Sequence, residues 1–270
     1  MGIKASDPIG IFDSGIGGLT VAQAVKKRLP GENLIYFGDT AHLPYGDKST
    51  AAIQAYSIKI CDVLLQHNCK VILIACNSAS AAAYELVKEY VGSKAKVMNV
   101  IDPVINYLRE NLVQTKVGLI GTKQTILSGV YAKKVKELEI GIELTSLATP
   151  LLVPMIEEGF FKNQISEDIL NEYLKREELS DIKALILGCT HYPLIKTEIQ
   201  NFYHSRVRIL DSSEIVVAAL KGLLDFHHLQ NSGSNHVDQF MVSDYTEAFE
   251  SSTQMFFQES VKLESHRLWE

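Results

Sequence analysis

The feature that most constrains this chain is a regular alternation between short apolar runs and longer amphipathic stretches. Strand-like apolar runs occupy residues 9–12, 33–39, 70–75, 96–101, 116–121 and 184–188. Stretches with helical periodicity lie between them, at residues 19–29, 50–68, 80–91, 102–113, 124–138 and 166–178. Strands that alternate with helices predict parallel sheets covered by helices on both faces. The sequence therefore predicts an α/β fold with doubly wound parallel sheets.

Two pairs of similar segments indicate that the chain consists of two similar halves. "VILIACNSAS" (71–80) and "LILGCTHYPL" (185–194) each place a cysteine after a strand, and these cysteines lie 113 residues apart (189 − 76). "GIFDSGIGGLT" (10–20) and "VGLIGTKQTI" (117–126) form a weaker pair, 107 residues apart (117 − 10). We expect one α/β domain from residues 1–98 plus 210–262 and a second from residues 99–209.

The C-terminal part of the chain carries weaker signals. Residues 229–243 are polar and rich in turn formers, so we expect a surface loop there, followed by a final strand and helix. Beyond about residue 262 we expect little regular structure.

Composition and charge exclude several classes of function. The formal net charge of −6 and a pI near 5.8 argue against nucleic acid as a main partner, because phosphate binding needs a basic face. No apolar run reaches the ~18 residues of a membrane helix, and the N-terminus lacks the pattern of a secretory signal. Four cysteines are a poor disulfide framework for a chain of this size, so we expect a cytoplasmic protein with reduced thiols.

The polar residues that directly follow the strands are the first candidates for a site, because ligands of parallel α/β sheets bind at the carboxyl ends of the strands. Cys76 and Cys189 both occupy such positions, each just before a predicted helix start, which lowers the pKa of a thiol. Cys61 and Cys69 lie in or just after a predicted helix. For these two we expect the role of small buried hydrophobic residues.

Four chemistries use cysteines in this way, and they differ in how well they fit. Zinc binding needs more ligands than C-N-S and C-T-H supply, and a redox disulfide usually has a C-x-x-C pair, which this sequence lacks. A single nucleophile would leave the second cysteine without a function. Proton transfer from opposite faces of a carbon atom uses both thiols. Two near-equivalent groups suit a reaction whose substrate and product are mirror images, and the two-half arrangement favours this use.

The glycine-rich segment "DSGIGG" (13–18) suggests a dinucleotide site, but the pattern fails. After Gly15 and Gly17, the position of the third glycine holds Thr20. The backbone amides of such a turn can instead hold a small carboxylate, with help from Ser14. We therefore predict no cofactor and no metal ion.

Four motifs in order, "IFDSGIGGLTV", "YFGDTAHLPYGDKS", "ACNSASA" and "GCTHYPL", resemble the bacterial glutamate racemases of the cofactor-independent aspartate/glutamate racemase superfamily. The resemblance covers about residues 8–225. It implies two α/β domains with the active site buried between them. It also implies interconversion of L- and D-glutamate as the activity, in the supply of peptidoglycan precursors for the cell wall. The substrate is then a small molecule, with no membrane partner, and a homodimer is left open.

The resemblance also implies roles for individual residues. Cys76 matches the thiol that takes the Cα proton from D-glutamate, and Cys189 the thiol that takes it from L-glutamate. Asp13 matches the carboxylate beside the first thiol, and His191 and Glu157 match the imidazole and carboxylate on the second side. The positions that match substrate-binding residues of the family are Asp13, Ser14, Tyr45, Gly46, Asn77, Ser78, Thr190 and His191.

Plainer interpretations stand beside these roles. Asp13 also fits a helix N-cap, His191 a hydrogen-bonded core residue and Glu157 a solvated helix face. At the level of the whole chain, a racemase for aspartate or another amino acid is one alternative. The other is a non-catalytic binding module in which the thiols serve only packing.

Overall fold

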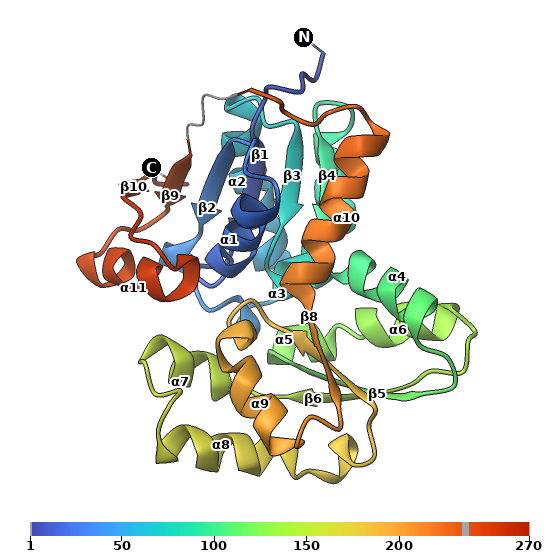
Figure 1. Cartoon of the computed structure of the whole chain (residues 1–270). Helices are drawn as coiled ribbons and strands as arrows, with labels where there is room; N and C mark the ends of the chain where they lie inside the picture. Colours follow the sequence, from blue (N-terminus) through green and yellow to red (C-terminus); the bar gives the residue numbers. More distant parts are fainter. Residues whose placement is uncertain (1, 234–237, 270) are drawn as a thin grey trace.

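A computed structural model describes residues 2–233 and 238–269 of the chain, and in this part the strands form two sheets in which every pairing is parallel (Figure 1). The larger sheet has the order β10-β9-β2-β1-β3-β4. Its strands are β1 (Ile9–Asp13), β2 (Leu34–Gly38), β3 (Val71–Ile74), β4 (Lys96–Asn99), β9 (Gln239–Val242) and β10 (Leu263–Ser265). The smaller sheet has the order β6-β5-β7-β8. Its strands are β5 (Lys116–Gly121), β6 (Glu143–Ala148), β7 (Ala184–Gly188) and β8 (Arg208–Asp211).

The two sheets share one topology. The order β2-β1-β3-β4 in the first corresponds strand by strand to β6-β5-β7-β8 in the second, and β9 and β10 extend the first sheet at its β2 edge. The predicted fold class, two similar α/β units with parallel sheets, is therefore confirmed. The exact domain boundaries stay a prediction, although β1–β4 and β5–β8 fall into separate sheets as that prediction requires.

Helices cover both faces of the first sheet because alternate strand residues point to opposite sides. Ile9 and Ile11 of β1 pack in a core with α1, α10 and α11, whereas Phe12 packs in a core with α2 and α3. These helices are α1 (Leu19–Arg28), α2 (Thr50–Gln66), α3 (Asn77–Val91), α10 (Ser212–Phe226) and α11 (Glu247–Phe257). Two short 3₁₀ turns, η1 (Thr40–His42) and η2 (Tyr45–Asp47), follow β2.

The second sheet is covered in the same way. Val117 and Ile186 pack under α4 and α6, while Leu185 and Leu187 share a core with α7, α8 and α9. That last core also includes Ile9 and Ile11, so one apolar cluster is continuous across both halves. The elements are α4 (Ile101–Asn111), α5 (Lys123–Leu127), α6 (Val130–Glu137), α7 (Leu152–Glu157), α8 (Gln164–Leu174), α9 (Lys196–Phe202) and the 3₁₀ turns η3 (Glu177–Leu179) and η4 (Tyr192–Ile195).

Two predicted elements are wrong in extent, for reasons that local chemistry explains. The single helix predicted over residues 124–138 is broken into α5 and α6 by Gly129, which has a φ of +66°. The strand predicted to reach residue 101 ends at Asn99, because the Asn99 side chain accepts hydrogen bonds from the N–H groups of Ile101 and Asp102 and so starts α4.

Other elements were not predicted at all. The sequence pattern did not predict five elements, namely β6, α7, α9, β8 and α10. β9 lies inside the loop expected for residues 229–243. Part of that loop, residues 234–237, lies outside the described residues. The expectation of an unstructured tail is wrong at β10, which pairs with β9.

The register of the strands decides where the cysteines lie. Phe12 is paired with Ile74 and Ile120 with Leu187. Cys76 follows two residues after Ile74 and contacts Ser14, and Cys189 follows two residues after Leu187. The two thiols thus occupy equivalent positions at the carboxyl ends of equivalent strands.

A buried ion pair lies at the amino ends of the strands of the first sheet, opposite the end that carries the thiols. Lys70 precedes β3 and is fully buried, and its ammonium group donates to Glu32 and to the carbonyl of Ala5. Glu32 also accepts the N–H of Asn231. The ion pair therefore joins four chain segments, those that precede β1, β2, β3 and β9, at the end of the sheet away from the thiols.

We predict that Lys70→Met destabilises the protein by about 3–5 kcal/mol, because it leaves the Glu32 carboxylate buried without its counter-charge. Urea unfolding monitored by circular dichroism measures the loss. The double variant Lys70→Met/Glu32→Gln is the control, and we expect it to recover a large part of the stability. Equal destabilisation of the single and the double variant would contradict this role of the ion pair.

Candidate active site

Cys76 lies two residues after β3 and caps the N-terminus of α3. The N–H of Ala79 donates to its sulfur at 3.4 Å, and the thiol faces the Ser14 hydroxyl oxygen at 3.7 Å. Burial, with the negative charge of Asp13 second, raises the pKa of the Cys76 thiol to about 12, while the contacts with Ala79 and Ser14 act in the opposite direction. In the free protein Cys76 is therefore a protonated thiol at neutral pH.

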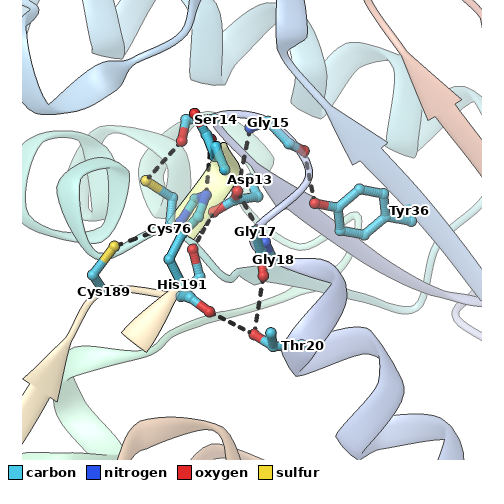
Figure 2. A network of polar contacts seen from close by, with 12 residues as sticks. Asp13, Ser14, Gly15, Gly17, Gly18, Thr20, Tyr36, Cys76, Cys189 and His191 are labelled. Carbon is cyan, nitrogen blue, oxygen red and sulfur yellow. Dashed lines mark hydrogen bonds and ion pairs between the residues drawn. The ribbon is translucent and has the colours of Figure 1, made fainter. Parts of the chain in front are cut away.

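Asp13 ends β1 and lies completely buried inside the turn that follows (Figure 2). One carboxylate oxygen accepts the N–H groups of Gly15 at 3.2 Å and Gly18 at 3.0 Å, and the other accepts the Thr190 hydroxyl at 3.5 Å. Burial raises the pKa of Asp13, and the His191 charge and the turn amides only partly offset it. Asp13 is therefore a carboxylate that can take up a proton more readily than an exposed one.

Cys189 directly follows β7 and has its own acid–base partners. Its sulfur lies 3.7 Å from Nδ1 of His191, and Nε2 of His191 lies 2.9 Å from a carboxylate oxygen of Glu157. Burial by itself opposes protonation of the imidazole, but the contacts with Cys189 and Glu157 outweigh it and raise the pKa of His191 to about 10. Cys189 thus lies beside a protonated imidazole, whereas the charged group near Cys76 is the carboxylate of Asp13.

The two halves meet at the turn after β1. A Cβ atom at Gly17 would lie 2.3 Å from Cε1 of His191, so the glycine backbone packs directly against the imidazole. The Thr20 hydroxyl donates to the carbonyl of Thr190 at 2.9 Å. Figure 2 shows both sulfur atoms beside this junction, Cys76 on the side of Ser14 and Cys189 on the side of His191.

Both thiols line one cavity of about 270 Å³ between the halves. Of the predicted site residues, those that line it are Ser14, Tyr45, Gly46, Cys76, Asn77, Ser78, Glu157, Cys189, Thr190 and His191. Asp13 is the exception, because its carboxylate lies behind the Ser14–Gly18 turn. Asp13 therefore reaches the cavity through neighbouring groups and is not part of its wall.

The polar side chains of the cavity wall differ in whether their hydrogen-bond donors are already used within the protein. Nδ2 of Asn77 is buried and has no hydrogen-bond partner among the described residues, while its Oδ1 accepts the hydroxyl of Tyr131 at 2.9 Å. The Ser78 hydroxyl contacts Thr122 Oγ1 at 2.9 Å. The Tyr45 hydroxyl donates to Asp39 at 2.6 Å, so its hydrogen is already engaged. Asn77 thus carries the clearest donor still to be satisfied.

Sequence reasoning missed part of the wall. The cavity is also lined by Gly15, Leu43, Pro44, Asp47, Thr122, Lys123, Thr149, Pro150, Val153, Pro154 and Gly188. Thr122 directly follows β5, a strand end that the sequence pattern already marked as a candidate position, whereas Thr149 directly follows β6. β6 and α7 were not predicted, and Thr149 and Val153 could not be found without them.

The described residues hold neither a cluster arranged to bind a metal ion nor a helix that could cross a membrane. In residues 2–233 and 238–269 no group of three or more His, Cys, Asp or Glu side chains is arranged to hold a metal ion. No helix in the same part of the chain is both long and apolar enough to cross a membrane.

The protein is thus a parallel α/β protein in which two strand-end thiols from different sheets line one cavity. The family model described as Asp/Glu/Hydantoin racemase matches residues 19–220. The chain therefore belongs to this racemase family and is an amino-acid racemase.

Individual relatives within this family show which racemases the chain is similar to. Glutamate racemase of Chlorobaculum parvum is 38% identical over 255 residues, which cover 94% of this chain and 93% of that protein. The structure of glutamate racemase from Francisella tularensis in complex with D-glutamate superposes with a TM-score of 0.91 at 39% identity, covering 98% of both chains. Glutamate racemase from Thermus thermophilus, in complex with β-chloro-D-alanine, has a TM-score of 0.88 at 35% identity and also covers 98% of both chains. Within the family, these relatives are all glutamate racemases.

We predict that Gly17→Ala lowers racemase activity at least about 100-fold, because the new methyl group displaces the His191 ring from Cys189. Steady-state racemisation assays measure the effect. Gly222→Ala, in α10, is the matched control, since a Cβ atom there meets nothing within 4 Å and alanine favours a helix. Unchanged activity in Gly17→Ala would show that the close approach does not position the imidazole.

The two thiols should also differ in reactivity. At pH 8 a thiol with a pKa of about 12 is ionised to roughly one part in 10⁴, so we expect iodoacetamide to modify Cys189, next to the protonated His191, before Cys76. Peptide mass spectrometry over time measures both rates, with the core cysteines Cys61 and Cys69 as internal controls that stay unmodified. Equal rates for Cys76 and Cys189 would contradict the electrostatic difference between the two sides.

Proposed function

We propose that this protein is a glutamate racemase that interconverts L- and D-glutamate by proton transfer at Cα between two thiols, without a cofactor. The observation that carries the proposal is the placement of Cys76 and Cys189. They lie at equivalent strand ends of two similar halves, face one cavity, and have separate acid–base partners. Two bases on opposite sides of a cavity are the arrangement that inversion at a carbon atom requires.

The choice of glutamate as substrate is supported by the relatives. The glutamate racemases of Chlorobaculum parvum and Francisella tularensis align with more than nine-tenths of both chains at 38% and 39% identity, and the Francisella tularensis structure is a complex with D-glutamate. The cavity wall combines hydroxyl and amide donors with the backbone of Tyr45 and Gly46, which suits a small molecule with two carboxylates. We assign its recognition to Ser14, Asn77, Ser78, Thr190 and the Tyr45–Gly46 backbone.

In the proposed reaction each thiol changes role with the direction. With D-glutamate, the Cys76 thiolate removes the Cα proton, the electron pair stays on Cα, and the Cys189 thiol delivers its proton to the opposite face. With L-glutamate, the same transfer runs from Cα to Cys189 and from Cys76 to Cα. Each turnover exchanges one proton for another, so the protein ends with the proton on the other sulfur.

The neighbouring groups make this cycle feasible in the proposed mechanism. The raised pKa of the buried Asp13 lets it accept the proton that Cys76 must lose before it acts as a base. His191, held by Glu157, accepts the proton that Cys189 must lose before it acts as a base, and the resulting imidazolium stabilises the Cys189 thiolate. The α-proton of an amino acid is a very weak acid, so donors fixed around the cavity, Asn77 Nδ2 among them, must stabilise the developing negative charge.

We further propose that the protein acts in the cytoplasm and supplies D-glutamate for peptidoglycan, and thereby for cell wall formation and cell shape. The acidic net charge of −6 favours a small-molecule substrate over nucleic acid as the partner. A homodimer is compatible with this role, and sedimentation of the purified protein measures it directly.

The test is racemisation in D2O. We expect the purified protein, without added cofactor, to incorporate deuterium at Cα from either enantiomer of glutamate while optical rotation falls to zero. Cys76→Ala and Cys189→Ala should each lose at least about 100-fold in rate, whereas Cys61→Ala, a change in the buried face of α2, should keep its activity. NMR and polarimetry follow the two signals.

The alternatives give different results in the same experiment. Faster turnover of aspartate than of glutamate would indicate a racemase for another amino acid. Absence of exchange with folded protein and either acid would indicate a binding module. Full activity in either active-site cysteine variant would contradict the two-thiol mechanism.

A further inference from the structure

The imidazole of His191 needs more than its two polar contacts to stay in place. Nδ1 faces the Cys189 sulfur and Nε2 faces Glu157, so the two contacts lie at the two nitrogens of the ring. The ring moves by rotation about the Cα–Cβ and Cβ–Cγ bonds, and either rotation carries its nitrogens away from these partners. Packing against the ring restricts both rotations.

Gly17 and Phe256 supply that packing, and both come from the other half of the molecule. Phe256 lies in the last turn of α11, is 2% exposed, and meets the His191 ring edge to face, with ring centroids 5.2 Å apart and planes at 83°. α11 packs on α1, and the Gln23 side chain donates to Gln258 at its end. Figure 1 shows α11 in red beside α1, on the side of the first sheet that carries β9 and β10.

The neighbouring aromatic residue has a different environment. Phe257 is 6% exposed and packs against Phe240 of β9, with ring centroids 5.1 Å apart and planes at 74°. The same helix turn thus directs one phenyl ring to the site and the next to the core of the first half. Similar burial and different neighbours make the two residues a matched pair.

We propose that Phe256 is a positioning residue of the racemase, which holds the His191 imidazole in line between Cys189 and Glu157. The proposal rests on the proposed function, in which His191 acts on Cys189. It assigns an active-site role to the C-terminal segment, which the sequence motifs do not include. In the same segment, Ser243 after β9 donates to Asp39, which in turn accepts the hydroxyl of the wall residue Tyr45.

The direction in which the pKa of His191 changes in a Phe256 variant distinguishes loss of ring alignment from simple hydration of the ring. The charged or titratable groups that face His191 are Glu157, Cys189 and Asp13. Loss of ring alignment removes the contacts with Cys189 and Glu157 that raise the pKa of His191 to about 10, so that pKa falls toward its ordinary value. Admission of water alone relieves the burial that opposes protonation, and so raises it. Misalignment and simple hydration therefore predict opposite shifts.

The experiment compares Phe256→Ala, Phe256→Leu and Phe257→Ala with the wild type. The first readout is the pH profile of kcat/KM for glutamate. Because enantiomers have equal free energy, the profile must change by the same factor in both directions, which is an internal check. The second readout is independent of activity: NMR titration of the His191 Cε1–H resonance, assigned by its loss in His191→Asn.

We expect Phe256→Ala to lower kcat/KM at least about tenfold and to move the alkaline limb and the His191 titration down by about one pH unit or more. Phe256→Leu should fall between this variant and the wild type, and it carries the test if the alanine variant does not fold. Phe257→Ala should lose stability and leave both titrations in place. An upward shift, no shift in either Phe256 variant, or the same shift in Phe257→Ala would overturn the proposal. A wild type that does not turn over glutamate would instead overturn the proposed function, while the NMR titration would still test the placement of His191.

Discussion

The contact between the turn after β1 and the segment after β7 is the constraint on which the rest of the site depends. Gly17 packs against the His191 ring, Thr20 donates to the carbonyl of Thr190, and the Thr190 hydroxyl reaches Asp13. The contact leaves room for a hydrogen atom but not for a methyl group. It brings together the carboxyl ends of two sheets that have no strand in common, and so two thiols from different halves come to line one cavity.

The two sides of that cavity are alike in topology and different in electrostatics. On the first side, burial and a buried carboxylate keep Cys76 protonated. On the second, an imidazole paired with a carboxylate stands beside Cys189. Such asymmetry is no obstacle to a racemase, because the equal free energies of the enantiomers require equal kcat/KM in both directions whatever the two bases are. The halves need only supply one proton donor and one acceptor at a time.

Both sides draw on structure that lies outside the active-site motifs. The β9–α11 segment extends the first sheet at its edge. Its Phe256 contacts His191 of the cavity wall, and its Ser243 donates to Asp39, which in turn accepts the hydroxyl of the wall residue Tyr45. Buried aromatic contacts of this kind restrict side-chain rotation without adding a charge. The precision of the acid–base pairs is therefore a property of the packed C-terminal segment as well as of the strand ends.

The sequence by itself determined the fold class and singled out the strand-end cysteines. Alternating apolar runs specify parallel α/β units, and the recurrence of a cysteine after a strand marked Cys76 and Cys189, because strand ends are local features that a pattern can record. Only the tertiary structure decided which groups meet them. Glu157 contacts His191 across 34 residues, Thr122 and Thr149 enter the wall from strand ends of the second sheet, and Phe256 reaches His191 from the opposite half. These contacts arise from the packing of elements distant in sequence, for Phe256 across the two halves, and this packing depends on the summed fit of many side chains, which no local periodicity records.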